Sequence, residues 1–165
     1  MQYNWDWGVI FREPYLEWML SGIGWTMSVS IAAWILAFSL GSIIGILRTT
    51  NNRILRAIAT VYVEIFRNIP LIVQMFLWYF VFPELLPNDS GMWVKREMPM
   101  PEFTTAAICL GLYTASRVAE QVRSGIQSVG QGQNNAGLAT GLTTVQVYRY
   151  ILLPVGYRIM IPPLT

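Results

Sequence analysis

The sequence predicts an all-α integral membrane protein, on the evidence of its composition and of one long uncharged run. Of its 165 residues 54% are hydrophobic and only 12% are charged, about half the charged share of roughly 25% in soluble domains. Residues 18–47 carry no charge, and this run is longer than the roughly 20 residues that cross a bilayer. The net charge of +2, without interleaved basic and aromatic residues, gives no reason to expect a nucleic acid partner.

The apolar segments predict three complete spans and the beginning of a fourth. We expect spans at 23–47, 57–82 and 103–122, and a fourth that begins after Pro154 and is cut short, so that the chain is truncated at its C-terminus. Residues 21–165 would form the transmembrane domain. Residues 1–20 would lie outside at the lipid–water boundary, because they are rich in aromatic residues: Trp5, Trp7, Phe11, Tyr15 and Trp18.

Charge next to the first span predicts the orientation of the chain. Arg48, Arg53 and Arg56 follow this span directly, and by the positive-inside rule they place the loop in the cytoplasm and the N-terminus outside. Within the span, Gly41 and Gly45 form a small-xxx-small pair, which predicts close packing on another helix.

A polar segment at about 124–154 is the cytoplasmic loop that this alternation of spans predicts. Gly141 can supply the positive φ that closes one helix, and Thr143 with Gln146 matches a capping box that opens the next. The segment therefore predicts a helix, a glycine turn and a second helix. Such a projection either docks on a partner or is an ordinary amphipathic connector.

The spacing in this loop resembles the EAA loop of ABC importer permeases. That pattern is Glu-Ala-Ala, three residues, Gly, nine residues, Ile-x-Leu-Pro, and here Asn135 replaces the glutamate and Gly137 the second alanine. The resemblance implies that the loop docks on an ATPase subunit. The residues that it assigns to docking are Asn135, Ala136, Gly137, Leu138, Ala139, Gly141, Leu142, Ile151 and Pro154. With no charge at Asn135, we expect docking to depend on shape and apolar contacts.

Charged residues at membrane depth are the candidates for a transport pathway, because each is costly to bury there. Glu64 and Arg67 share a helix face, and Asn68, Pro70 and Gln74 follow. Pro70 should kink the span, and a kinked helix with exposed polar groups can line a pathway. A Glu64–Arg67 pair that only fastens helices together is the alternative.

The third span carries a second set of charges, in which Arg117, Glu120 and Arg123 recur every three residues. Residues 64–74 resemble Glu-x-Phe-Arg-Gly-Thr-Pro-Leu-x-x-Gln of polar amino-acid permeases, and residues 116–124 resemble Ala-Tyr-x-Ala-Glu-x-x-Arg-Gly, with Arg117 at the tyrosine. A guanidinium suits bidentate capture of a carboxylate, so Arg117 is expected to select an anionic side chain. Its alternative is an intrahelical pair with Glu120.

Together these resemblances, which cover roughly residues 20–163, imply a permease subunit of an ABC importer for polar amino acids, of the glutamate/aspartate type. They imply the all-α type-1 importer helix bundle, of about five spans in the full protein, in the bacterial inner membrane. They also imply a cytoplasmic ATPase, a second homologous permease and a periplasmic solute-binding protein as partners.

We expect ATP hydrolysis, the energy source for transport, to take place on another chain. The sequence holds no phosphate-binding Gly-x-x-x-x-Gly-Lys-Ser/Thr loop, so ATP and Mg would be used by a partner and no cofactor is expected here. With no His, and with Cys109 alone in an apolar segment, we expect no metal site and no enzyme. An ion- or proton-coupled carrier or channel that uses Glu64, Arg67 and Glu120 is the alternative function.

Overall fold

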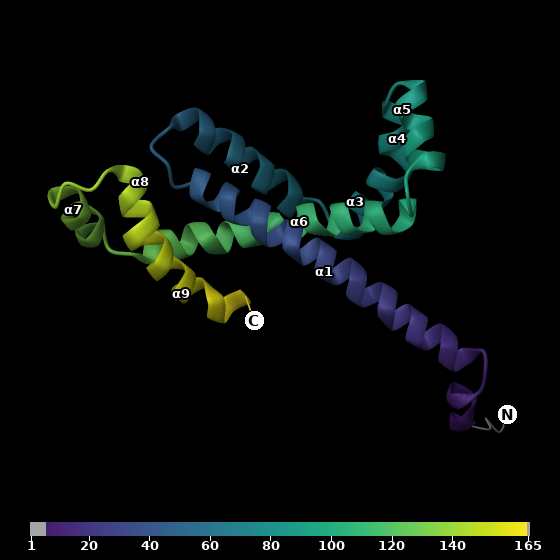
Figure 1. Cartoon of the computed structure of the whole chain (residues 1–165). Helices are drawn as coiled ribbons and strands as arrows, with labels where there is room; N and C mark the ends of the chain where they lie inside the picture. Colours follow the sequence, from purple (N-terminus) through teal and green to yellow (C-terminus); the bar gives the residue numbers. More distant parts are fainter. Residues whose placement is uncertain (1–5, 165) are drawn as a thin grey trace.

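The computed structural model describes residues 6–164, with the side chains of residues 6–159, and all regular structure in this part is helical. The first residues of the expected interfacial segment, Trp5 among them, lie outside the described residues, as does Thr165. Figure 1 shows α1 and α6 as two long crossing helices, with α2 beside their crossing and the helices after α6 gathered at one end.

The helices follow the chain in the order expected, with different bounds. A 3-10 turn, η1 (Trp7–Phe11), precedes α1 (Tyr15–Leu47), which begins inside the expected interfacial segment. The remaining elements are α2 (Arg53–Asn68), α3 (Leu71–Phe76), η2 (Leu77–Val81), α4 (Phe82–Leu85), α5 (Asn88–Met92), η3 (Trp93–Glu97), α6 (Pro101–Ser128), α7 (Gln131–Ala139), α8 (Thr144–Val147), η4 (Tyr148–Leu152) and α9 (Leu153–Leu164). Unlike η1, the segments η2, η3 and η4 are π-helical.

Helix α6 is the centre of the fold and packs against α1, α2 and α9. Its closest contact is with α1, as the glycine pair predicts. A Cβ added at Gly45 would lie 2.6 Å from Val122 Cβ and 2.7 Å from Ala119 O, and one at Gly41 would lie 2.7 Å from Val118 Cβ. The lack of a side chain at these two positions lets the two backbones approach.

Two buried clusters hold this arrangement together. Ile44, Ala59, Val63 and Ala119 join α1, α2 and α6. The second cluster joins α6 to the segment that follows it and consists of Val118, Val122, Ile126, Val129, Val147 and Leu152. Cys109 is fully buried and unpaired within the described part of the chain.

The expected spans differ in how well their helices suit lipid. By length and apolarity, α1 alone qualifies as a membrane span among the described residues, and α2 with the segment up to Leu85 qualifies if the bent pair is one span. The 28 residues of α6 reach about 42 Å, which exceeds the roughly 30 Å hydrocarbon layer. However, α6 carries four charged residues, which lower its hydropathy.

The second span is broken, not kinked. Helix α2 ends at Asn68, and the helical segment from Leu71 to Leu85 leaves it at 101°. Pro70 at the break cannot donate a backbone hydrogen bond and disfavours helix at the residue before it, so Ile69 is extended with φ −96° and ψ 126°. The sequence predicts the place of the bend but underestimates its size.

The segment between the second and third expected spans, residues 83–101, is also helical, since α4, α5 and η3 lie within it or overlap it. Gly91 of α5 is buried against Pro83, and an added Cβ there would lie 2.4 Å from Pro83 O. An ion pair between Lys95 and Glu84 joins η3 to α4. These contacts make this segment a small folded unit (Figure 1).

The close contact between α1 and α6 gives a first prediction. A Gly45→Ala substitution places a methyl group against both Val122 and the backbone of α6, so the helices must move apart, and overpacking of this kind costs about 1–3 kcal/mol. We expect a lower melting temperature of the detergent-purified complex, measured by fluorescence-detected size exclusion after heating.

The matched control is Gly22→Ala in the same helix, where nothing lies within 4 Å of the added Cβ. This variant should melt at or slightly above the temperature of the parent, because alanine is the better helix former. Equal melting of the two variants would contradict the close-contact explanation.

Candidate functional site

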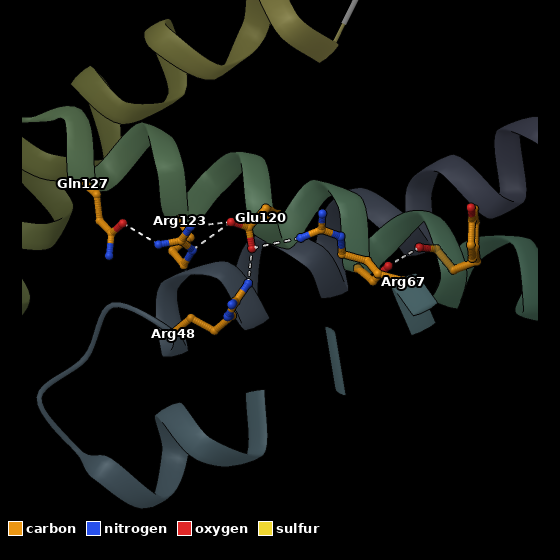
Figure 2. Close-up of polar contacts among 7 residues, drawn as sticks. Arg48, Arg67, Glu120, Arg123 and Gln127 are labelled. Carbon is orange, nitrogen blue, oxygen red and sulfur yellow. Dashed lines mark hydrogen bonds and ion pairs between the residues drawn. The ribbon is translucent and has the colours of Figure 1, made fainter. Parts of the chain in front are cut away.

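Glu120 is the centre of a cluster of charged side chains from three helices. Its carboxylate is paired with Arg48 at the end of α1 and with Arg123 one turn further along α6. Arg67, in the last turn of α2, lies with Nη1 3.6 Å from Glu120 Oε2. Figure 2 shows these arginines pointing at Glu120 from different directions, with Gln127 extending the network beyond Arg123.

The three arginines hold Glu120 with different strengths. The side chain of Arg48 is 12% exposed, and Arg48 and Arg123 both donate hydrogen bonds to the carboxylate. Arg67 is 51% exposed, and its distance of 3.6 Å exceeds that of a hydrogen bond, so its attraction is purely electrostatic. Three guanidinium groups thus share one carboxylate, and the cluster keeps excess positive charge.

The pair that the sequence suggests between Glu64 and Arg67 does not form. Glu64 is exposed and has no ion pair or hydrogen bond in the described part of the chain, whereas Arg67 turns to Glu120. The alternative of a neutralised Glu64–Arg67 pair is therefore wrong. Arg67 therefore contacts the carboxylate that Arg48 and Arg123 already hold in place, and not the one nearest to it in the sequence.

Arg117 also lacks the partner that its spacing suggests. Its Nη2 donates to the hydroxyl of Tyr113 at 2.6 Å, and its guanidinium lies 5.0 Å from the centroid of that ring. No ion pair joins Arg117 to Glu120, and the side chain is exposed. The alternative of an intrahelical pair is wrong, because Glu120 is occupied by Arg48 and Arg123.

The remaining candidates for the pathway lie near the break after α2 and differ in accessibility. Asn68 is exposed at the end of α2. Gln74 is only 4% exposed, and its amide nitrogen donates to the carbonyls of Phe66 at 2.9 Å and Ile69 at 2.8 Å. The structure thus brings Arg67 and Glu120 together but leaves Glu64, Asn68 and Arg117 outside this cluster.

A cavity of about 270 Å³ lies elsewhere, between α3, η2 and the start of α6. Ile72, Phe76, Phe80 and Ala106 give it an almost entirely apolar wall, and Glu102 is its one carboxylate. Tyr79 donates a hydrogen bond to Glu102 at 3.3 Å. None of the residues expected in the pathway lines this cavity.

The second candidate site is the α7–α8 hairpin, residues 131–147, and its local geometry is as predicted. Gly141 has φ +85° in the turn between the helices. Gln146 N donates to Thr143 Oγ1 at 3.4 Å, and Thr143 N donates to Gln146 Oε1 at 2.8 Å, which completes the capping box. The sequence therefore forms a compact helix–turn–helix projection, visible at one end of the molecule in Figure 1.

The residues assigned to docking divide into an exposed and a buried set. Leu138 is 46% exposed, and the other exposed members are Asn135, Ala136, Ala139, Gly141 and Pro154. Gly137 is buried, where an added Cβ would lie 2.7 Å from Ile151 Cδ1. Leu142 and Ile151 are partly buried and pack against the buried cluster of α6. Leu142 therefore has only part of its side chain available to a partner.

One contact of the residue that follows the hairpin was not predicted from the sequence. The hydroxyl of Tyr148, which follows α8, lies 2.9 Å from the carbonyl oxygen of Thr49 and 3.1 Å from its Oγ1. Thr49 is next to Arg48, so this contact ties the hairpin to the loop that supports the Glu120 cluster. The sequence shows a tyrosine at the start of an apolar segment, but it does not indicate the partner of its hydroxyl, which is 99 residues away.

Comparison with known proteins gives consistent matches. Residues 37–165 match the family described as the binding-protein-dependent transport system inner membrane component. The chain is 52% identical to the glutamate/aspartate import permease protein GltJ of Escherichia coli strain K12, over all of this chain and 70% of that relative. It is 30% identical to the glutamate/aspartate import permease protein GltK of Escherichia coli O157:H7, over 97% of this chain and 69% of that relative.

A solved structure also matches closely. The structure described as a crystal structure of an amino acid ABC transporter with histidines superposes with a TM-score of 0.76 at 26% identity. The match covers 98% of this chain and 70% of that chain. The helical arrangement described above is therefore one that an experimental structure also contains.

The charged cluster generates a prediction about stability. A Glu120→Gln substitution keeps the shape of the side chain but leaves three guanidinium groups without their anion. Because the carboxylate is 25% exposed, we expect a cost of about 2 kcal/mol, between that of a surface pair and that of a fully buried pair. The corresponding fall in the melting temperature of the purified complex is about 5 °C.

Glu64→Gln is the matched control, because Glu64 is exposed and has no partner in the described part of the chain. Surface substitutions of this kind stay within about 0.5 kcal/mol. A fall for Glu64→Gln as large as that for Glu120→Gln would mean that the cluster contributes nothing specific.

Proposed function

Because the chain belongs to the family of inner membrane components of binding-protein-dependent transport systems, it is a permease subunit of an ABC importer, and we propose that it carries acidic amino acids, glutamate and aspartate. The observation that carries this proposal is the 52% identity with a glutamate/aspartate import permease over the whole chain. Family membership also excludes the ion-coupled carrier or channel considered as an alternative. The chain is not an enzyme, since ATP is hydrolysed on a separate subunit.

The charges of the described residues support an anionic cargo. Arg67 and Arg117 are exposed, and neither donates a hydrogen bond to a carboxylate. A guanidinium with uncommitted donors can take a carboxylate in a bidentate pair, which ammonium groups cannot do. Arg117 is the residue that we assign to recognition of the cargo's side-chain carboxylate, and Glu64, Asn68 and Glu120 would complete the polar pathway with Arg67.

The proposal also includes the orientation of the chain in the membrane and its partners. We place the N-terminus outside, so that the arginines after α1 and the α7–α8 hairpin lie in the cytoplasm. There the exposed set of the hairpin would dock on the ATPase. A second homologous permease would complete the pathway, and a periplasmic solute-binding protein would deliver the cargo to the outer end. ATP and Mg belong to the ATPase in this proposal.

The role of Arg117 can be tested by comparing two cargoes. With the complete transport complex in proteoliposomes, Arg117→Ala should lower uptake of labelled aspartate about tenfold, the loss of one charged hydrogen-bonded contact of about 1.4 kcal/mol. Uptake of labelled glutamine, wherever the parent complex shows it, should change less than twofold. Arg117→Lys should give an intermediate loss for aspartate, because the charge remains without the bidentate geometry.

Arg56→Ala is the matched control, since it removes an exposed arginine from α2 at the opposite end from the break. It should leave both uptake rates close to those of the parent. An equal loss of aspartate and glutamine uptake in Arg117→Ala would refute the role in selectivity.

The docking role of the hairpin can be tested by cross-linking to the ATPase. Single cysteines at Ala136, Leu138 and Ala139, introduced into a Cys109→Ala background, should cross-link because these positions are exposed on one projection. A cysteine at the buried Gly137 should cross-link poorly. Thr26→Cys, on the outward half of α1, is the negative control.

The pattern of cross-links, not a single product, decides this prediction. Strong products at the exposed hairpin positions with none at Thr26→Cys would support docking there. Failure at every position from 134 to 145 would refute it.

A further inference from the structure

We propose that Gln74 is a positioning residue, which clamps the break between α2 and α3 and so holds Arg67 within reach of Glu120. The sequence reading places Gln74 in the transport pathway. The structure gives this side chain a different task, because it is buried and its two hydrogen bonds go to backbone carbonyls, one in the last turn of α2 and one in the break that follows.

The need for a clamp arises at Pro70. In an uninterrupted helix the carbonyl of residue 66 would accept from the N–H of residue 70, and proline has no N–H. Phe66 O is therefore one of the carbonyls that the end of α2 leaves without a helical partner. Gln74 Nε2 donates to it at 2.9 Å and replaces the missing bond.

The second bond of the amide spans the break itself. Ile69 is in the extended conformation, so its carbonyl leaves the direction of the α2 axis, and Gln74 Nε2 donates to it at 2.8 Å. The backbone N–H of Gln74 meanwhile bonds to Pro70 O at 3.1 Å, which fixes the first turn of α3. Gln74 thus connects α3 both to the last turn of α2, at Phe66, and to the break, at Ile69.

The orientation of the amide follows from these bonds. With the group reversed, its oxygen would face two carbonyl oxygens and neither would have a donor. In the observed orientation, Gln74 Oε1 is buried without a partner among the described residues. An unpaired buried acceptor is unfavourable, and here the two bonds made by the nitrogen offset it.

In the sequence, Arg67 lies between Phe66 and Ile69, the two residues whose carbonyls Gln74 binds. Among the described residues, its guanidinium has only the 3.6 Å contact with Glu120 to hold it, and more than half of the side chain is exposed. With so weak a contact of its own, the direction of Arg67 is set by the backbone turn from which it projects. Releasing that turn should free Arg67 from the cluster, while Arg48 and Arg123 keep Glu120 in place.

The test uses the complete transport complex and two readouts, one of which rests on the proposed cargo. Gln74→Met keeps the length of the side chain and removes the donor. We expect aspartate uptake to fall about tenfold in Gln74→Met and comparably in Arg67→Gln. The double variant should be no slower than Arg67→Gln alone, because Gln74 would act through Arg67.

The second readout is independent of the cargo. Hydrogen exchange of the backbone amides at 66–74 in the purified complex should be at least about tenfold faster in Gln74→Met than in the parent. Gln121→Met, the same chemical change in α6 at a side chain with no such clamp, should leave both readouts unchanged. Should Gln74→Met fail to assemble, Gln74→Asn carries the test, since its shorter amide cannot reach both carbonyls and should give intermediate values.

The proposal is overturned if the uptake defects of Gln74→Met and Arg67→Gln multiply in the double variant, or if exchange at 66–74 does not change in the variants of Gln74. A parent complex that imports neither glutamate nor aspartate would refute the proposed cargo instead. In that case hydrogen exchange still decides whether Gln74 is the clamp.

Discussion

The carboxylate of Glu120 is the interaction on which the arrangement of the first helices depends. Small residues such as Gly45 and Ala119 let α1 and α6 approach along one face of each helix. Glu120 then fixes how the helix ends meet, because Arg48 must bring the end of α1 to the anion on α6, and Arg67 adds a weaker contact from the end of α2. The requirement is strictest for Arg48, whose side chain is 12% exposed, because a charge left unpaired in a low-dielectric surrounding is costly.

The same cluster is connected to the α7–α8 hairpin through a short series of contacts. Val147 at the end of α8 is fully buried in the core beside α6. Tyr148, the next residue, contacts Thr49, whose neighbour Arg48 is paired with Glu120. A displacement of the hairpin would therefore be transmitted to the charged cluster through neighbouring contacts. The apolar contact is the packing of Val147 in the core, and the polar contacts are those of Tyr148 with Thr49 and of Arg48 with Glu120.

Features set by a few neighbouring residues could be predicted from the sequence, and features set by distant partners could not. The positive φ of Gly141 and the capping box of Thr143 depend only on residues within one turn, and both are confirmed. The alternative that paired Arg67 with Glu64 was wrong, because spacing along α2 indicates Glu64 but says nothing of a carboxylate 53 positions further along the chain. Likewise Pro70 marks a bend, whereas its 101° angle depends on how α3 packs on α6.

Gly137 shows how a departure from a family pattern can be structurally consistent. It stands where the resemblance has alanine, and even a methyl group there would lie 2.7 Å from Ile151 and 3.1 Å from Val147. The large side chain of Ile151 thus occupies the room that the glycine leaves, and α7 packs directly on η4. The hairpin is then fixed to the segment that leads into α9 by side-chain packing, in addition to the turn at Gly141. A rigid attachment of this kind would compensate for the missing charge at Asn135, because a partner that recognises shape requires the shape to be held in place.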